Sequence, residues 1–425
     1  MNLIYSAHKH SMEMINLIAS EAWFPPEYKL PYILDMFHRY SYDIDNASIV
    51  QGLPGFSNRP FLNEIENKCI SLLQSYFGCT YASVKPISGL NMMLSVLSSV
   101  TQRGNYILSI PPSLGGHSAT KHIAERMGLI HEYIPITKDE ALLKTGRLQI
   151  DVAGTKQLIE AKRVQCVYLD LMHVVHPIDL HILREAVGKK TIVIYDASHV
   201  LGLIMGGQFQ SPLEEGADIL IGTTHKTFPG PHKGVVLTNS KWLHNLYRMT
   251  CDVYISHHHI ADVATLMLLL GQGKEFFDNY AVRLIENSTT FFEECDKHGI
   301  PAIGGQTHQI WIDLNDAVDY ATLVHSINGE GIIVNEIEIP FSGHRGLRLG
   351  LQEITYRGFD KADVTVLCSL ICHLILEKKL DIEQREALKQ LKNKLKASFF
   401  QSLSSFEKYI SNLYNLEADE YECRY

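Results

Sequence analysis

The sequence predicts an α/β protein in which a large domain built on a mostly parallel, seven-stranded type of sheet is followed by a small C-terminal α/β domain. Two observations carry this prediction. Short apolar runs alternate with amphipathic helical stretches between residues 60 and 240, and a shorter alternation of the same kind begins near residue 308, after a mainly helical stretch. Regular strand–helix alternation is typical of parallel sheets that are covered by helices on both faces.

The individual elements follow from the length and spacing of these runs. Apolar runs that we interpret as short buried strands span 106–112, 166–171, 191–198, 218–224 and 234–239, and helical spacing covers 61–78, 118–129 and 181–188. In the smaller unit we expect strands over 308–314, 331–339 and 346–351, with helices near 318–328 and from about residue 360. We therefore divide the chain into an N-terminal arm (1–50), a large domain (51–275), a small C-terminal domain (276–377) and a charged helical tail (378–425).

Composition narrows the functional class. The formal net charge of −9 argues against a nucleic-acid partner, and no apolar run is long enough to predict a membrane-spanning helix. The N-terminus lacks the basic-then-apolar pattern of a secretory leader, and the eight cysteines form no CxxC pair. We expect a cytoplasmic protein with neither a disulfide framework nor a metal site.

Charged residues stand where two predicted strands end. In open parallel sheets ligands bind outside the carboxyl ends of the strands, and this rule selects Asp196 after "TIVIY" and Lys226 within "GTTHKTFPGPHKG" (222–234). One interpretation is a structural ion pair. The other is that both residues hold pyridoxal phosphate, with Lys226 forming an imine with its aldehyde and Asp196 keeping its ring nitrogen protonated.

Four further residues can complete such a cofactor site. Ser88 and Gly89 open an amphipathic helix whose N-terminus suits a phosphate, although Ser-Gly is also an ordinary helix cap. His117, after a Gly-Gly pair, can stack on the cofactor ring or serve a structural role. His199, three residues beyond Asp196, is a candidate partner for the phenolic oxygen of the cofactor or for the substrate.

The segment "DASHVLGLIMGGQFQSPLEEGADILIGTTHKTFPGPHKG" (196–234) resembles the core of serine hydroxymethyltransferase, a fold-type I pyridoxal-phosphate enzyme. The stretches "LIASE" (17–21), "SYFGCTYASVKPISG" (75–89), "GGHSATK" (115–121) and "GLRLGLQEITYRGF" (346–359) match in the same order. The resemblance implies that Lys226 carries the cofactor, Asp196 pairs with the ring nitrogen and His117 stacks on the ring. It also implies that Arg348 binds the α-carboxylate of an amino acid and that Ser20 assists there.

The sequence departs from the family at positions that bear on the reaction. Pro60, in "GFSNRPF" (55–61), stands where the family has a glutamate that serves folate-dependent one-carbon transfer, unless Glu64 or Glu66 supplies that carboxyl. Other segments, such as "THQ" (307–309) and "NEIEIP" (335–340), resemble the L-threonine transaldolases of antibiotic biosynthesis, which also lack the glutamate. Leu90, Met172 and His232 likewise replace residues that are usual in the family.

We therefore expect an enzyme that cleaves or forms the Cα–Cβ bond of β-hydroxy-α-amino acids through a glycine quinonoid, with L-threonine as donor, an aldehyde as acceptor and no folate. The alternatives are a tetrahydrofolate-dependent hydroxymethyltransferase, or a decarboxylation, transamination or oxidation on the same scaffold. A base near the substrate hydroxyl is needed, and His199, His225, Tyr40 and Tyr42 are the candidates.

Two cysteines and a histidine run need separate interpretation. Three adjacent histidines in "YISHHHI" (254–260) cannot all converge on a metal without a kink in the chain. The family builds its active sites across homodimers, so the run is a better candidate for the phosphate site of a neighbouring subunit. Cys368 and Cys372, with His373, are expected to pack on one helical face, and the Lys-rich tail to be solvated or to cover a partner subunit.

Overall fold

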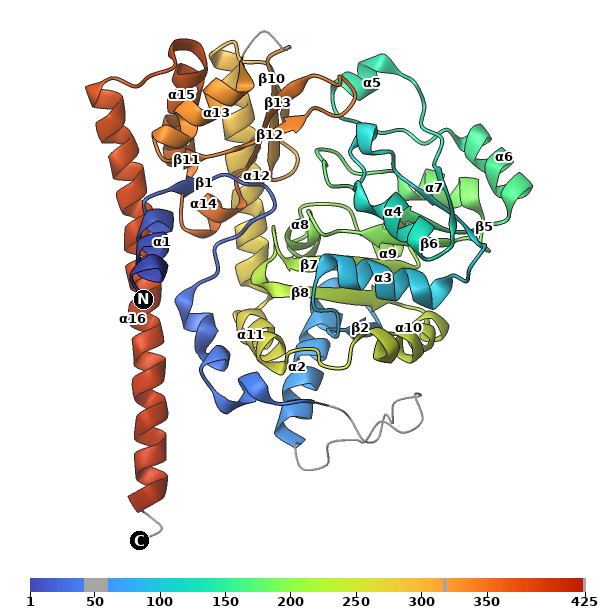
Figure 1. Ribbon diagram of the computed structural model, residues 1–425, viewed down its shortest axis with the longest axis horizontal. Coiled ribbons are helices and arrows are strands. Elements are labelled where there is room, and N and C mark those ends of the chain that lie inside the picture. The colour runs from blue at the N-terminus through green and yellow to red at the C-terminus, as the bar shows by residue number, and fades with distance from the viewer. Residues whose placement is uncertain (42–59, 316–318, 423–425) are drawn as a thin grey trace.

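The computed structural model describes residues 1–41, 60–315 and 319–422 (Figure 1). A seven-stranded sheet has the order β2-β8-β7-β6-β5-β3-β4. Strands β3 to β7 pair in parallel, whereas β8 runs antiparallel to both of its neighbours, so the expected mostly parallel sheet is confirmed. The strands are β2 (Tyr81–Ser83), β3 (Tyr106–Ser109), β4 (Ile130–Tyr133), β5 (Val164–Leu169), β6 (Ile192–Asp196), β7 (Ile219–His225) and β8 (Pro229–Thr238).

Alternate residues of the central strands enter two separate cores, one on each face of this sheet. On β6, Ile192 and Ile194 lie in a core shared with α3 (Gly89–Val100), α4 (Ala119–Arg126) and α10 (Lys241–Tyr254). Val193 and Tyr195 lie in a larger core on the other face. Because both faces are covered, the strands read as continuous apolar runs. The helices of the second layer include α2 (Pro60–Phe77), α6 (Val152–Lys162), α7 (Leu180–Val187), α11 (Ile260–Leu270) and α12 (Lys274–Lys297).

A four-stranded antiparallel sheet follows, in the order β12-β13-β10-β9. Its strands are β9 (Ala302–Gly304), β10 (Gln309–Asp313), β12 (Asn335–Glu338) and β13 (Arg345–Gly350), and its helices include α13 (Tyr320–Gly329) and α15 (Lys361–Glu377). The strand expected over 331–339 is two strands, since β11 (Ile332–Ile333) leaves this sheet to pair with β1 (Ile15–Asn16). The four domain ranges given above remain a prediction.

The N-terminal segment is held against the end of β13. The Gly350 N–H donates to the Leu17 carbonyl at 2.8 Å, and Gln352 Nε2 donates to the carbonyls of Ile18 at 2.7 Å and Glu21 at 2.5 Å. The approach is so close that a Cβ on Gly350 would lie 2.4 Å from the Cα of Ala19. The fold thereby places residues 17–21 beside the second sheet.

The charged tail is one long helix, α16 (Ile382–Glu422), that runs along the side of the molecule and past it, next to the N-terminal helix α1 (Asn2–Met12) (Figure 1). Its first half is anchored by buried leucines, including Leu391 and Leu395, and by Arg357, whose Nη2 donates to the Leu395 carbonyl at 2.8 Å. Among the described residues, no helix is both long enough and apolar enough to cross a membrane.

Replacement of Gly350 by alanine is predicted to destabilise the fold by about 1–3 kcal/mol, because the added methyl group overlaps backbone atoms of Ala19 that cannot move independently. Chemical unfolding of the purified protein measures this. Gly329→Ala, in the helix α13, is the matched control, since nothing lies within 4 Å of its added Cβ. Equal stability of the two variants would contradict the close packing of residues 17–21 against β13.

Candidate active site

Four of the predicted residues meet at the carboxyl edge of the large sheet. Asp196 ends β6 and Lys226 follows β7 directly. They line a cavity of about 310 Å³ together with His117 and His199. The same cavity is also lined by Ser88, Gly89, Leu90, Met93, Asp170, Leu171, Met172, Ser198, Thr223, His225 and His232. The rule that ligands bind at strand ends therefore selects residues that the fold does bring together.

Lys226 lies in the tight connection between the antiparallel strands β7 and β8. The backbone there is fixed by Thr227, whose hydroxyl donates to the His199 carbonyl at 2.9 Å and whose own carbonyl accepts from the Tyr280 hydroxyl at 3.0 Å. The next residue, Phe228, is fully buried. The glycine and prolines that follow Lys226 thus belong to a constrained hairpin, and this hairpin fixes the direction in which the lysine side chain points.

Burial, opposed by the charge of Asp196 and aided by that of Arg348, lowers the pKa of Lys226 from 10.5 to about 8. A lowered pKa increases the fraction of the amine form, which is the nucleophile that attacks an aldehyde. The ammonium form still predominates at neutral pH, but the amine form is far more populated than in an ordinary lysine, which a purely structural ion pair would not require.

A chain of hydrogen bonds sets the tautomer of His199. The Trp311 indole can only donate, so its 3.0 Å contact identifies Gln309 Oε1 as the acceptor. Gln309 Nε2 then donates to His199 Nδ1 at 3.2 Å and to the Met172 carbonyl at 3.1 Å. His199 is buried, and burial together with nearby cations lowers its pKa well below the usual value, so the ring is neutral. Its single proton is therefore on Nε2.

This assignment bears on the lysine, since His199 Nε2 lies 3.2 Å from Lys226 Nζ. A ring N–H that donates there needs an acceptor, and only the amine form of Lys226 offers a lone pair. The hydrogen bond and the lowered pKa of Lys226 agree. Gln309 and Trp311 were not predicted as site residues, because no pattern in the sequence indicates that β10 lies next to His199.

Asp196 is oriented by three donors. Its Oδ2 accepts from the Tyr168 hydroxyl at 2.8 Å, and its Oδ1 accepts from the backbone N–H of Ser198 at 2.9 Å and from the Ser198 hydroxyl. A carboxylate has about four acceptor positions, so one position is left for a ring N–H. The second carboxyl group of the cavity, Asp170, differs from it. Burial raises the pKa of Asp170 well above its usual value, and its oxygens accept from Thr120 and from the N–H of Ile110.

Ser88 and Gly89 lie at the start of α3, as predicted. The Ser88 hydroxyl caps the helix by accepting from the Asn91 N–H at 3.3 Å, and a Cβ on Gly89 would lie 2.9 Å from a methyl group of Thr223. Helix N–H groups that face the cavity suit a phosphate. His117 is fixed by two hydrogen bonds. Its backbone N–H donates to the Asp170 carbonyl at 3.0 Å, and its ring Nδ1 accepts from the Ala119 backbone N–H at 3.1 Å.

Arg348, on β13, is 6% exposed, and its Nε and Nη1 have no hydrogen-bond partner among the described residues. Burial lowers the pKa of Arg348 to about 10. A buried guanidinium with two unpaired donors favours a bidentate anion. Ser20 lines a neighbouring cavity of about 590 Å³, which shares His225 and His232 with the first one.

Other candidates lie elsewhere in this chain. Tyr40 stacks on His257 at 4.4 Å, and Tyr42 is outside the described residues. Glu64 is exposed, and Glu66 pairs with His258 at 2.9 Å; neither glutamate lines the cavity. Pro60 begins α2 and is exposed, while residues 55–59 of its segment are not described.

The histidine run divides between two environments. His258 is buried and its carbonyl accepts from Lys233 Nζ at 2.6 Å, whereas His257 and His259 contact each other with ring centroids 4.7 Å apart. His258 therefore has contacts separate from those of His257 and His259, in a segment that is not a strand, and the expectation that this run binds no metal stays a prediction.

The cavity fits pyridoxal phosphate on its own chemistry. It offers a nucleophilic amine for the aldehyde, an oriented carboxylate for the ring nitrogen and a helix N-terminus for the phosphate, and unpaired guanidinium donors lie next to it. With the seven-stranded sheet, these features define a fold-type I pyridoxal-phosphate-dependent enzyme of the transferase and aldolase kind.

Comparison with known proteins makes the assignment more specific. Residues 1–371 match the family described as serine hydroxymethyltransferase, and the chain belongs to this family. Serine hydroxymethyltransferase of Methanopyrus kandleri is 30% identical over 404 residues, covering 91% of this chain and 90% of the relative. L-threonine:uridine-5'-aldehyde transaldolase of an Amycolatopsis species is 30% identical over 365 residues, covering 83% and 86%. The crystal structure of L-threonine transaldolase from Pseudomonas fluorescens in its internal aldimine state superposes with a TM-score of 0.81 at 26% identity, covering 94% of this chain and 90% of that one.

The depressed pKa of Lys226 predicts how the protein without cofactor takes up pyridoxal phosphate. The rate of covalent attachment should rise with pH through a midpoint near 8 rather than 10.5, because the attacking amine appears as the ammonium loses its proton. Arg348→Met removes a charge that lowers this pKa, so its midpoint should move upward. Absorbance of the reducible covalent link, followed from about pH 6 to about pH 10, measures both.

Arg345→Met is the control for this experiment, because Arg345 lies on the same strand but is exposed and pairs with Glu336. Its midpoint should equal that of the unaltered protein. If borohydride reduction fixed the cofactor to a lysine other than Lys226, the assignment would be wrong.

Proposed function

We propose that this enzyme transfers the glycyl unit of a β-hydroxy-α-amino acid, with L-threonine as donor, to an aldehyde without folate. The observation that carries the proposal is the set of proton-transfer groups in the cavity. Among the described residues that line it, the carboxyl groups are Asp170 and Asp196, and both are already engaged in hydrogen bonds. A carboxyl group free to exchange a proton between a substrate hydroxyl and folate is lacking from that set.

Neutral imidazoles are present instead. Burial, the neighbouring His232 and Lys226 lower the pKa of His225 to about 3, so this ring stays uncharged at neutral pH. Its Nδ1 has no hydrogen-bond partner among the described residues, whereas both ring nitrogens of His199 are engaged. We therefore favour His225 as the group that accepts a hydrogen bond from the substrate hydroxyl and orients it when the Cα–Cβ bond breaks, since a ring with a pKa of about 3 is a weak base for full proton transfer.

The roles of the other residues follow from their positions. Arg348 binds the α-carboxylate through its unpaired donors, Ser20 assists it from the N-terminal segment, and His117 stacks on the ring. Ser88 and Gly89 hold the phosphate. Bound pyridoxal phosphate supplies the electron sink that stabilises the carbanion at Cα. His199, fixed as a donor by Gln309, faces the point where Lys226 meets the cofactor.

The acceptor aldehyde would occupy the neighbouring cavity, the one that Ser20 lines. Its volume of about 590 Å³ leaves room for an aldehyde larger than acetaldehyde, and its walls combine Trp23, Phe24 and Phe399 with the charged groups of Glu21, Lys29, Glu353 and Arg357. His225 and His232 line both cavities. His225 would therefore lie between the site of the donor amino acid and the site of the acceptor aldehyde. An aromatic aldehyde suits this lining.

We also propose a homodimer with shared active sites. Leu90, at the rim of the cavity, is 51% exposed although it is apolar, and a second chain placed there would cover it. Sedimentation of the purified protein tests the dimer, and mixing of two differently inactivated variants tests whether sites are shared.

The deciding assay for the reaction incubates the enzyme with L-threonine and benzaldehyde in the absence of folate. We expect acetaldehyde and a new phenyl-substituted β-hydroxy-α-amino acid, both abolished by Lys226→Ala. The alternative, folate-dependent hydroxymethyl transfer, is favoured by the relatives that carry that name. Serine–glycine exchange that requires tetrahydrofolate, with no acetaldehyde from threonine, would replace our proposal with this alternative.

Arg348→Ala is predicted to weaken amino-acid binding by tens- to thousands-fold, since loss of one partner of a buried charge pair costs about 2–5 kcal/mol. The cofactor should remain bound, because Lys226 and Asp196 are untouched. Spectral titration with glycine measures the affinity, and Arg345→Ala on the same strand is the control. An affinity equal to that of the control would remove Arg348 from the carboxylate site.

A further inference from the structure

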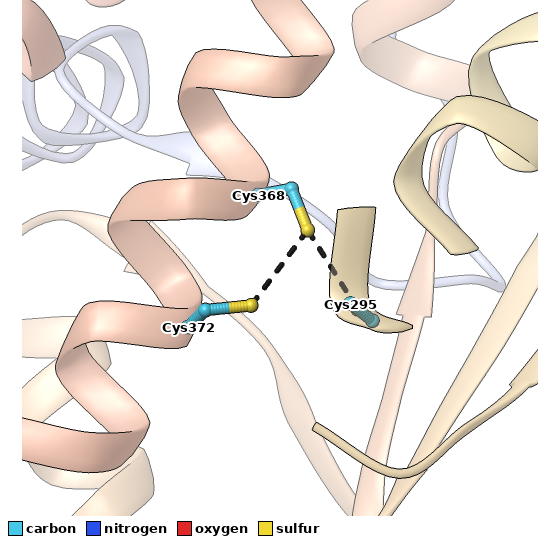
Figure 2. Close-up of side chains that lie close together, drawn as sticks. All are labelled: Cys295, Cys368 and Cys372. Carbon is cyan, nitrogen blue, oxygen red and sulfur yellow. Dashed lines mark hydrogen bonds between the residues drawn. The ribbon is translucent and has the colours of Figure 1, made fainter. Parts of the chain in front are cut away.

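Three cysteines from two helices meet in the larger core, and none of them lines the cavities described above. Cys368 and Cys372 lie one turn apart on α15, and Cys295 reaches them from α12 (Figure 2). All three side chains are fully buried. The sequence led us to expect only that two of them share a helical face, since the third lies 73 positions away from Cys368.

The sulfur atoms are spaced as metal ligands are. Cys368 Sγ lies 3.6 Å from Cys295 Sγ and 3.8 Å from Cys372 Sγ, and the three atoms lie within 4.8 Å of one another. Thiolates that bind one ion at about 2.3 Å are separated from each other by about 3.8 Å in tetrahedral geometry. Two of the separations thus match coordination without movement of the backbone.

The surroundings favour a preformed site over simple packing. α12 and α15 pack along each other over much of their length, which fixes the three Cβ positions. Cys368 Sγ also lies 3.4 Å from the Phe291 carbonyl, while Cys295 and Cys372 have only sulfur neighbours among their hydrogen-bond contacts. Three thiols that face one another gain little from such contacts, because the S–H group is a weak donor.

A histidine and a glutamate flank Cys295 at the C-terminal end of α12. His298 follows Cys295 by one turn, is 36% exposed at its side chain, and contacts the Ser369 hydroxyl at 3.1 Å, one turn before Cys372. Glu294 is largely buried next to it, with Oε1 3.9 Å from His298 Nε2. Imidazole and carboxylate groups are the usual completing ligands for such an ion or for its orientation.

We propose that Cys295, Cys368 and Cys372 bind one soft d10 cation, Zn²⁺ or Cu⁺, as a structural site that ties α12 to α15. Soft thiolate ligands select these ions over Mg²⁺ or Ca²⁺. Each sulfur that coordinates releases its proton to water, and no electron transfer is involved. The site is separate from catalysis, because none of the three cysteines lines either cavity at the cofactor site.

The test uses the full-length holoenzyme, reduced, freed of metal with a chelator and kept under argon. It is titrated separately with Zn²⁺, with Cu⁺ and with Cd²⁺ as a spectroscopic probe. We expect one ion per chain, an ultraviolet thiolate-to-cadmium charge-transfer band and a higher Tm in the presence of the preferred ion. Comparison of the Zn²⁺ and Cu⁺ titrations identifies which ion binds more tightly.

Cys372→Ser and Cys295→Ser should weaken binding by more than about 100-fold, since even loss of a group outside the ligand set costs 10- to 100-fold. Cys79→Ala is the matched control, because Cys79 is a buried thiol outside the cluster, and it should bind like the unaltered chain. If a cysteine variant does not fold, the metal titration of the unaltered protein still tests the proposal through its stoichiometry and its thiolate-to-cadmium band.

Absence of the charge-transfer band in the unaltered protein would overturn the proposal, as would equal affinity in Cys372→Ser and Cys79→Ala. A disulfide between two of the three cysteines in the protein purified with reductant, found by mass spectrometry in place of bound metal, would also overturn it.

Discussion

The arrangement of the site depends on one buried amine. A lysine side chain that is removed from water retains its charge only at a cost, and here the surroundings reduce that charge rather than compensate it fully. Arg348 opposes the ammonium form and Asp196 favours it, so the two nearby charges partly cancel and burial decides. The tight β7–β8 connection makes this possible, since it directs the side chain inward while Thr227 and Phe228 hold the backbone.

The second sheet contributes as much to the site as the first. β13 carries Arg348, β10 begins with Gln309 directly after His308, and the contact of Gly350 with Ala19 draws the N-terminal segment to the same place. His308 Nε2 lies 3.1 Å from the Ala19 carbonyl and its ring stacks on His199. A displacement of one sheet relative to the other would therefore move Arg348 relative to Lys226 and break the hydrogen bond from Gln309 that sets the tautomer of His199. On the proposal that Arg348 binds the substrate carboxylate, this contact would couple substrate binding to the tautomer of His199.

The sequence predicts the large sheet well because its strands are buried on both faces and stand out as apolar runs. It misses both edge strands, β2 with only three residues and β4 with residues that are mostly exposed or half-buried. It also joins β11 to β12, because the apolar run does not show where the chain changes partner. Lys226 and Asp196 could be predicted as site residues because they follow apolar strands. Arg348 could be predicted only from the resemblance to a known family. Asp170 directly follows β5, yet it was counted within an apolar run and overlooked. Contacts between distant segments, such as that of Gln309 with His199, leave no local pattern.

The reaction that such a scaffold performs depends less on the cofactor than on the groups that move protons near it. The electron sink stabilises a carbanion at Cα whichever bond is broken, so Arg348, the imidazoles and the shape of the adjoining cavity must distinguish the outcomes. In this chain a stacked pair, His225 and His232 with ring centroids 4.0 Å apart, occupies the boundary between the two cavities. Burial, His232 and Lys226 together lower the pKa of His225 to about 3, which keeps that ring neutral beside the substrate. A family member that carries an arginine in place of His232 would have a permanent cation there, and the same boundary would favour an anion over a proton acceptor.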